Sequence, residues 1–183
     1  MKINTKHNEV FEFRPITTSD QAMLVDFFEG LSPETLSKFG PHPLTSKYCN
    51  EALNPNLGKD GVSRYIIASK EKVVGYFIVD FNEYPHERAR YNAYQIDLDF
   101  RVDPVFAPCI ADTYQNQGIA GKAFKALIST LQDSKLRSLV LMGGTQEPNT
   151  LARNFYKRHG FQELGEFYTD YNGLNNIDMR LML

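Results

Sequence analysis

The sequence predicts a mixed α/β fold in which helices flank an open sheet. Apolar stretches that suit strands alternate along the chain with stretches whose apolar residues recur at helical spacing. Residues 63–69 and 73–80 have strand character and are joined by a short polar turn, which is the pattern of a hairpin. With 183 residues and 42% hydrophobic content, the chain is long enough to bury one sizeable core.

A single domain is expected over residues 10–183. Residues 1–9 lack an apolar signal core and are expected to form a flexible leader. Residues 11–16 suit an opening strand, and a first helix follows through Phe28. A second helix is expected from Ser32-Pro33 to about Phe39, because serine suits the N-cap and proline the first helical position. Residues 176–183 alternate in polarity and are expected to form the last strand.

The centre of the chain has the pattern of an anion-binding turn. Apolar residues 105–111 predict a strand, and residues 122–128 have helical spacing. Between them lies a turn rich in small residues, which include Gly118, Ala120 and Gly121. The first N–H groups of a helix have no partner inside the helix, and the helix dipole adds partial positive charge there. We therefore expect a phosphate-bearing ligand at this turn.

Two common phosphate motifs do not fit the spacing. A Walker loop needs serine or threonine after Gly121-Lys122, where the chain has Ala123. A dinucleotide fingerprint needs a third small residue that is missing after Gly118-x-Ala120. The pattern Gln115-x-x-Gly118-x-Ala120 instead resembles the acetyl-coenzyme A loop of the GCN5-related N-acetyltransferase (GNAT) family.

A second segment strengthens this resemblance. Residues 138–142 predict a buried strand, and Gly143-Gly144 indicates a bulge or a close approach of backbone. A helix is expected between an N-cap at Asn149 and a stop at Gly160, with Phe161 packing back on it. The pattern Asn-x-x-Ala-x-x-Phe-Tyr-x-x-x-Gly-Phe over residues 149–161 resembles the second cofactor segment of the GNAT family.

The resemblance covers roughly residues 10–183 and implies a fold and an activity. It implies a central, mostly antiparallel, twisted sheet flanked by helices. It also implies transfer of an acetyl group from acetyl-CoA to a primary amine, in a small molecule or a peptide, by direct attack in a ternary complex. The implied contacts to coenzyme A comprise Ile110, Ala111, Asp112, Gln115, Asn116, Gln117, Gly118, Ile119, Ala120, Gly121, Lys122, Asn149, Phe155 and Tyr156.

The resemblance also suggests catalytic roles. Tyr156 matches the family's tyrosine and is expected to give a proton to the leaving CoA thiolate. The alternative is that Tyr156 only packs the helix against the sheet. The N–H group of Ile110 or of a neighbour is expected to stabilise the oxyanion.

The general base is less defined, because the strand over residues 105–111 carries no acid. Residues 81–104 are longer than a simple link and are interpreted as an insertion that bears on substrate specificity. Within it, residues 85–90 suit a polar loop and residues 94–102 an extra strand with Asp97 and Asp99 on one face. These two carboxylates are the candidate base, and the alternative is that they only form a solvated face. Other candidates for the base are Glu83, Glu147 and a water relay.

Composition excludes several classes of partner. The net charge of −2 gives no electrostatic case for nucleic acid. No apolar run is long enough to span a membrane. Cys49 and Cys109 lie far apart, which suits free thiols in a reducing cytoplasm. The histidines show no metal-ligand spacing, so no metal is expected.

Homodimer formation and the identity of the acceptor remain open. A CoA-binding module without catalysis, acting as a sensor or scaffold, is the alternative function. An anion-binding structural domain that does not use coenzyme A is a more distant one.

Overall fold

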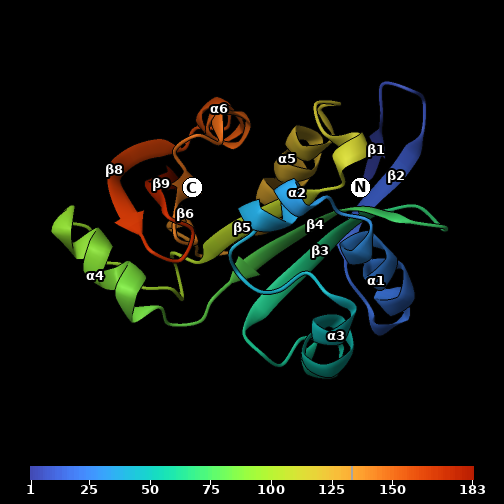
Figure 1. Cartoon of the computed structure of the whole chain (residues 1–183), viewed down its shortest axis with the longest axis horizontal. Helices are drawn as coiled ribbons and strands as arrows, with labels where there is room; N and C mark the ends of the chain where they lie inside the picture. The colour runs from blue at the N-terminus through green and yellow to red at the C-terminus, as the bar shows by residue number, and fades with distance from the viewer. Residues whose placement is uncertain (133) are drawn as a thin grey trace. The chain divides into compact units, whose positions relative to one another are not determined.

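The computed structural model describes residues 1–132 and 134–183, which divide into two compact units (Figure 1). The first unit comprises Met1–Val79 and Ala107–Leu131, and the second comprises Asp80–Phe106 and Gln132–Leu183. The chain passes from the second unit back into the first within strand β5 (Val105–Ile110).

The sheet of the first unit follows the order β1-β2-β3-β4-β5. Strands β1 and β2 pair antiparallel, as do β2 and β3. Strand β4 is buried along its whole length, as expected for an uninterrupted apolar run. The bounds are Lys2–Asn4 for β1, Val10–Pro15 for β2, Val62–Ala68 for β3 and Val73–Asp80 for β4. The predicted strands over residues 63–69 and 73–80 are confirmed.

The flexible leader predicted for residues 1–9 is wrong. Strand β1 pairs with β2 in the register Lys2↔Glu12, Ile3↔Phe11 and Asn4↔Val10. The side chain of Ile3 is buried, which gives the pairing a hydrophobic anchor. A three-residue strand carries too little periodicity to be recognised from sequence.

Short helices cover this sheet, and local capping explains where they begin. A 3-10 turn (Thr18–Asp20) leads into α1 (Gln21–Glu29). Both carboxylate oxygens of Asp20 accept hydrogen bonds from Arg14, and one also accepts the N–H of Thr17. The Arg14 hydrogen bonds, with those from Thr17, lower the pKa of Asp20 to about 2 despite the opposing effect of burial. Helix α2 (Pro33–Lys38) begins as predicted, with Ser32 accepting the N–H of Thr35.

The sequence did not predict the helical stretch that follows. Helix α3 (Ser46–Tyr48), a π-helical turn (Cys49–Leu53) and a 3-10 turn (Asn54–Asn56) succeed one another. Each element is shorter than the window that periodicity needs, and Asn54-Pro55 is a turn signal. The helix expected after the small-residue turn is α5 (Ile119–Leu131).

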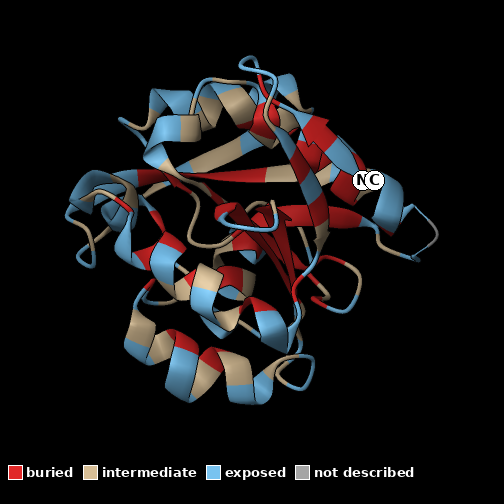
Figure 2. Cartoon of the chain, turned by 90° about the vertical axis from the view of Figure 1, so that its right-hand side faces the viewer, coloured by how far each residue is buried: buried red, intermediate tan, exposed pale blue. Residues whose placement is uncertain are grey.

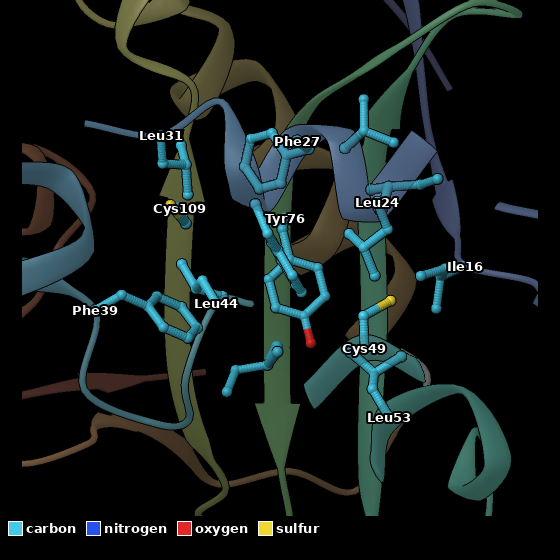
Figure 3. Close-up of a cluster of buried hydrophobic side chains, with 14 of the residues drawn as sticks. Ile16, Leu24, Phe27, Leu31, Phe39, Leu44, Cys49, Leu53, Tyr76 and Cys109 are labelled. Atoms are coloured by element: carbon cyan, nitrogen blue, oxygen red, sulfur yellow. The ribbon is translucent and has the colours of Figure 1, made fainter. Parts of the chain in front are cut away.

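One core cluster of the first unit packs α1 and the segment that follows it against one face of the sheet. Buried residues are concentrated on the strands, and the outer faces of the helices are exposed (Figure 2). Figure 3 shows Phe27 of α1 above the fully buried Tyr76 of β4, Leu24 of α1 beside it, and Leu53 at the lower right. Cys109 of β5 belongs to the same cluster. The strand that feeds the candidate site is therefore fixed from this face by apolar packing.

The second unit is built around β9 (Leu174–Met182), which pairs antiparallel with three strands. These are β6 (Ser138–Leu141), β7 (Thr145–Gln146) and β8 (Gln162–Thr169). The start of β5 pairs in parallel with β6, in the register Val105↔Val140 and Phe106↔Leu141. The strand predicted at the end of the chain is confirmed.

The interpretation of the insertion is wrong in two respects. Residues 85–90 belong to a helix, α4 (Pro85–Ala93), with Pro85 in its first turn. Residues 94–102 form turns and irregular chain, not a strand. Their alternating pattern reflects Leu98 and Phe100, which are buried beside Tyr91 of α4 without a partner strand.

Buried polar contacts hold α4 within the second unit. Arg90 donates to both carboxylate oxygens of the fully buried Asp178 on β9, at 2.5 and 2.9 Å. The guanidinium carbon also lies 3.7 Å from the ring centroid of Phe167 on β8. The hydroxyl of Tyr91 donates to the carbonyl of Met179. The inserted helix is therefore part of the packing of this unit.

The glycine pair after β6 gives a test of local packing. Gly143 and Gly144 both have left-handed φ angles, 61° and 70°. A Cβ at Gly144 would lie 2.6 Å from the carbonyl oxygen of Ile177, whereas one at Gly143 meets nothing within 4 Å. We expect Gly144→Ala to lower the free energy of unfolding by about 2–4 kcal/mol, because overpacking adds to the left-handed strain.

Gly143→Ala is the matched control and should cost about 1 kcal/mol, because it carries the strain alone. Urea titrations followed by circular dichroism measure both values. Equal losses in the two variants would contradict the close approach of Gly144 to β9.

Candidate functional site

The turn between β5 and α5 has the geometry of an open helix N-terminus. A 3-10 turn (Asp112–Tyr114) follows the strand, and Asn116 and Gly118 then adopt left-handed φ angles of 59° and 77°. The first helical hydrogen bond here runs from the N–H of Lys122 to the carbonyl of Gly118, at 3.3 Å. The N–H groups in the first turn of α5 are therefore available to a ligand.

The space beside this turn suits a phosphate. A Cβ added at Gly118 would meet no atom within 4 Å, so the space above the glycine is open. Ile119 is buried and anchors the start of the helix, while Ala120 and Gly121 present no large side chain. Backbone N–H donors, a dipole of the right sign and open space together fit a phosphate or diphosphate group.

The turn is braced by the side chain of Gln115. Its amide nitrogen donates to the carbonyl of Ile110 at 3.1 Å and to the hydroxyl of Thr35 at 3.1 Å. The amide of Gln117 donates to the carbonyl of Thr113 at 2.8 Å. These bonds tie the end of β5 and helix α2 to the turn, so its conformation does not depend on the glycine alone.

Asp112 provides the second brace. Its carboxylate accepts the N–H of Ser32 at 2.9 Å, the hydroxyl of Ser32 at 2.6 Å and the hydroxyl of Thr35 at 2.7 Å. Burial opposes the charge, but the hydrogen bonds from Ser32 and Thr35 prevail and lower the pKa of Asp112 below its usual value. A carboxylate held in this way is a structural acceptor and a poor general base.

Within the first unit, the last residues of β5 form a sheet edge. Pairing with β6 ends at Phe106, and β4 is the neighbour of β5 in the order of the first unit. The N–H of Ala111 donates to the carbonyl of Val74 on β4 at 3.0 Å. Because successive residues of a strand direct their N–H groups to opposite edges, the N–H of Ile110 faces away from β4. Pro108, on the same edge, has no N–H to offer.

The second predicted segment lies in the second unit and has the expected local structure. The side chain of Asn149 caps α6 (Thr150–Arg158) by accepting the N–H of Ala152 at 3.3 Å. Gly160 ends the helix with φ of 90°, and the ring of Phe161 lies 5.2 Å from that of Tyr156. The predicted N-cap, stop and back-packing are confirmed.

Tyr156 is a buried residue of α6, with 8% of its surface exposed. The ring of Phe155, which is partly buried, lies edge-on to it at 5.3 Å. Packing and a chemical role for the phenol are compatible, because packing also fixes the direction of the hydroxyl. The cationic Lys157 on the same helix lies 3.0 Å from the carboxylate of Glu163.

The two candidate bases, Asp97 and Asp99, do not lie on a strand, because residues 94–102 form turns and irregular chain. The side chain of Asp97 is 91% exposed, and its carboxylate lies 3.9 Å from Arg88. Asp99 accepts hydrogen bonds from the guanidinium of Arg101 and from its N–H, and these lower the pKa of Asp99 to about 2. The shared strand face for Asp97 and Asp99 is wrong, and their catalytic role stays a prediction.

Helix α2 contributes to this site in a way that its sequence does not predict. The local pattern predicts only a helix cap at Ser32 and no role for Thr35. Both residues contact Asp112, which lies 80 and 77 residues further along the chain. No local signal encodes a contact over that separation.

The part of the chain that the structure describes lacks both a membrane-spanning helix and a cluster of metal ligands. None of its helices combines the length and the apolar character that crossing a bilayer requires. None of its His, Cys, Asp and Glu side chains gather in a group of three that suits a metal ion.

Comparison with known proteins adds evidence of family. A model of the acetyltransferase (GNAT) family matches residues 24–161. No curated protein sequence matches the chain. The fold is similar to that of the GNAT domain of PAT from S. lividans, with a TM-score of 0.74 at 15% identity over 100% of this chain and 96% of that one.

Two other solved structures share the fold. An acetyltransferase of the GNAT family from Streptococcus pneumoniae has a TM-score of 0.68 at 19% identity, over 94% of this chain and 99% of that one. The ribosomal-protein-S5-alanine acetyltransferase from Vibrio fischeri has a TM-score of 0.72 at 15% identity, over 100% of this chain and 96% of that one.

The Asp112 contacts predict a pH-dependent contribution to stability. Because the pKa of Asp112 is lowered in the folded state, its contribution is present above the unfolded value of about 3.9 and is lost as pH falls through the folded value. We expect Asp112→Asn to lower the free energy of unfolding by about 1 kcal/mol at neutral pH, a modest value because the residue is exposed.

Denaturant titrations at several pH values measure the difference in free energy of unfolding between the wild type and Asp112→Asn. This difference should disappear under acid conditions. Asp170→Asn, at an exposed position in the turn between β8 and β9, is the control and should change little. A difference for Asp112→Asn that stayed constant down to strong acid would contradict the charged role of Asp112.

Proposed function

This chain belongs to the acetyltransferase (GNAT) family, and from that premise we propose that it transfers an acetyl group from acetyl-CoA to a primary amine. The observation that carries the proposal is the open turn at Gly118 between an edge strand and the N-terminus of α5. The amides of Gln117 to Gly121 would hold the diphosphate there. The edge of β5 would pair with the amides of the pantetheine arm as an added strand does.

An amine acceptor agrees with the chemistry of the family. The structural neighbour from Vibrio fischeri is named for acetylation of an alanine of ribosomal protein S5. An alkyl amine with a pKa near 10.4 is less than about 0.1% neutral at pH 7, so the amine must lose a proton before it attacks. The nitrogen then forms a bond to the acetyl carbon, and the bond from that carbon to sulfur breaks.

The protonation state of the two cysteine thiols favours direct attack of the amine on the thioester. Cys109 is the only cysteine on β5, and burial together with the nearby Asp112 carboxylate raises the pKa of its thiol to about 12. Burial also raises the pKa of Cys49. Neither side chain would supply the thiolate that a covalent acyl-enzyme requires. Two buried free thiols also agree with the reducing cytoplasmic setting that we propose.

We assign stabilisation of the oxyanion to the N–H of Ile110. The N–H of Ala111 is already donated to Val74, and Pro108 has none. Ile110 is therefore the residue near the end of β5 whose N–H faces the free edge of the first unit. A fixed backbone donor of this kind typically contributes about 3–4 kcal/mol to the lowering of the barrier.

We assign to Tyr156 the role of general acid, which gives a proton to the leaving sulfur, because this residue matches the family motif. For the base we favour a water relay, because the pKa of Asp99 is lowered to about 2 and Asp97 is almost fully exposed. An acid with so low a pKa has little drive to take a proton from an amine. Asp97 and Asp99 stay candidates that substitution by asparagine would test.

The role of Tyr156 is tested by Tyr156→Phe, which removes only the hydroxyl. We expect kcat for acetyl transfer to fall about 10- to 100-fold, within or just below the usual range for a general acid, with little change in the KM for acetyl-CoA. Release of free thiol in the presence of a panel of amines measures this rate. Tyr168→Phe, at a 62% exposed position on β8, is the matched control and should be unaffected.

Unchanged turnover in Tyr156→Phe would show that the ring only packs. If the wild-type protein binds acetyl-CoA but acetylates none of the amines in the panel, the alternative of a CoA-binding module without catalysis is supported.

The role of the turn is tested by Gly118→Glu. A carboxylate in the open space would repel and obstruct a phosphate, and we expect affinity for acetyl-CoA to fall at least about 100-fold, or about 2.7 kcal/mol. Gly58→Glu is the matched control, because Gly58 has a similar φ of 74° and equally open surroundings. Calorimetric titration of the two variants compares them at equal backbone strain. Equal affinities would overturn the assignment of the turn.

A further inference from the structure

The hairpin of β1 and β2 holds its connecting turn in a defined conformation. The hydroxyl of Thr5, which is 6% exposed, accepts the N–H groups of His7 at 3.2 Å and Glu9 at 3.1 Å. The backbone of Thr5 also bonds to Glu9 and Asn8, and Asn8 takes a left-handed φ of 63°. Lys6 therefore projects from an ordered turn.

This hairpin is attached to the turn at Gly118. Tyr114, one residue before Gln115, donates its hydroxyl to the carboxylate of Glu9 at 2.9 Å. Lys72 contacts the same carboxylate at 3.1 Å, and the rings of Phe11 and Tyr114 meet edge to face at 5.4 Å. Polar and aromatic contacts thus fix the hairpin beside the phosphate-binding turn.

Two lysines link the hairpin and the turn directly. Lys6 donates to the carbonyl of Asn116 at 3.2 Å, and Lys122 donates to the carbonyl of Asn4 at 2.7 Å. Both lysines are exposed. Elsewhere, Lys38, Lys72 and Lys157 each contact a carboxylate. Across residues 1–132 and 134–183, no carboxylate forms a salt bridge with Lys6 or Lys122, and the same holds for other exposed lysines such as Lys2.

We propose that the N-terminal hairpin is part of the coenzyme site, with Lys6 and Lys122 binding a phosphate group of coenzyme A. The inference rests on the function proposed above. An exposed lysine usually serves only solvation, but hydrogen bonds hold these two where the hairpin meets the segment that carries the open turn. Their positive charges would add to those of the α5 dipole and of its free N–H groups, and all of these favour an anion.

Calorimetric titration with acetyl-CoA tests the proposal. Lys6→Met keeps the length of the side chain and removes the charge, and we expect Kd to rise about threefold to fivefold, as for one exposed ion pair. The double variant with Lys122→Met should raise Kd about tenfold. Lys2→Met is the matched control, because Lys2 is an exposed lysine of the same hairpin at the opposite end of β1.

Truncated donors identify the phosphate. If the effect of Lys6→Met disappears with 3′-dephospho-acetyl-CoA, the partner is the ribose 3′-phosphate. If it persists there but disappears with S-acetylpantetheine, the partner is the diphosphate. The effect should also shrink in high salt, because exposed charges are screened.

Other results would overturn the proposal. Equal Kd values for wild type and Lys6→Met, equal losses in Lys6→Met and Lys2→Met, or an effect that persists with S-acetylpantetheine would each do so. These outcomes leave the proposed function standing, because the wild-type protein still binds acetyl-CoA. Absence of binding by the wild type would remove both.

Discussion

The carboxylate of Asp112 is the contact on which the geometry of the candidate site depends. It joins the end of β5 to the N-terminus of α2 through three hydrogen bonds from Ser32 and Thr35. Thr35 in turn accepts a hydrogen bond from Gln115, which also donates to Ile110. Strand end, turn and helix cap therefore form one network. A left-handed turn next to an exposed helix N-terminus would otherwise have several accessible conformations.

Backbone groups and titratable side chains have different roles at the candidate site. In the function proposed above, a charged, extended donor would be bound by backbone groups, which do not change with protonation and cost little reorganisation. Side chains with perturbed pKa values instead hold the frame: Asp112 and Asp20 stay ionised because they accept several hydrogen bonds. Burial keeps Cys109 protonated. The titratable groups near the turn thus support the position of the reacting groups more than they react.

Features encoded by a few neighbouring residues could be predicted from the sequence. The turn at Gly118, the N-cap at Asn149, the stop at Gly160 and the strands on either side of residues 70–72 are all present. Each needs a particular residue for a local physical reason, such as a positive φ or an unpaired N–H. The family resemblance rested on the same local features and is supported by the match over residues 24–161.

Features that depend on distant partners could not be predicted. The alternation over residues 94–102 was misread because Leu98 and Phe100 are buried against α4, not in a strand. The hairpin of β1 and β2 is local, but its attachment to the rest of the unit needs the contact of Glu9 with Tyr114, 105 residues away. The braces from Ser32 and Thr35 to Asp112 are likewise distant in sequence. Periodicity reports burial, but it does not name the surface that causes it.

Pro108 has a consequence for which molecules can pair with the edge of β5. A free edge normally offers alternating donors and acceptors and so invites another chain to extend the sheet. Here the missing N–H at Pro108 breaks the alternation and leaves Ile110 as the donor nearest the turn. A long peptide strand would lose a ladder hydrogen bond at that point, whereas a short arm with widely spaced amides would lose none. Pro108 thus disfavours the pairing of another peptide strand with this edge, while a small ligand can still bind there.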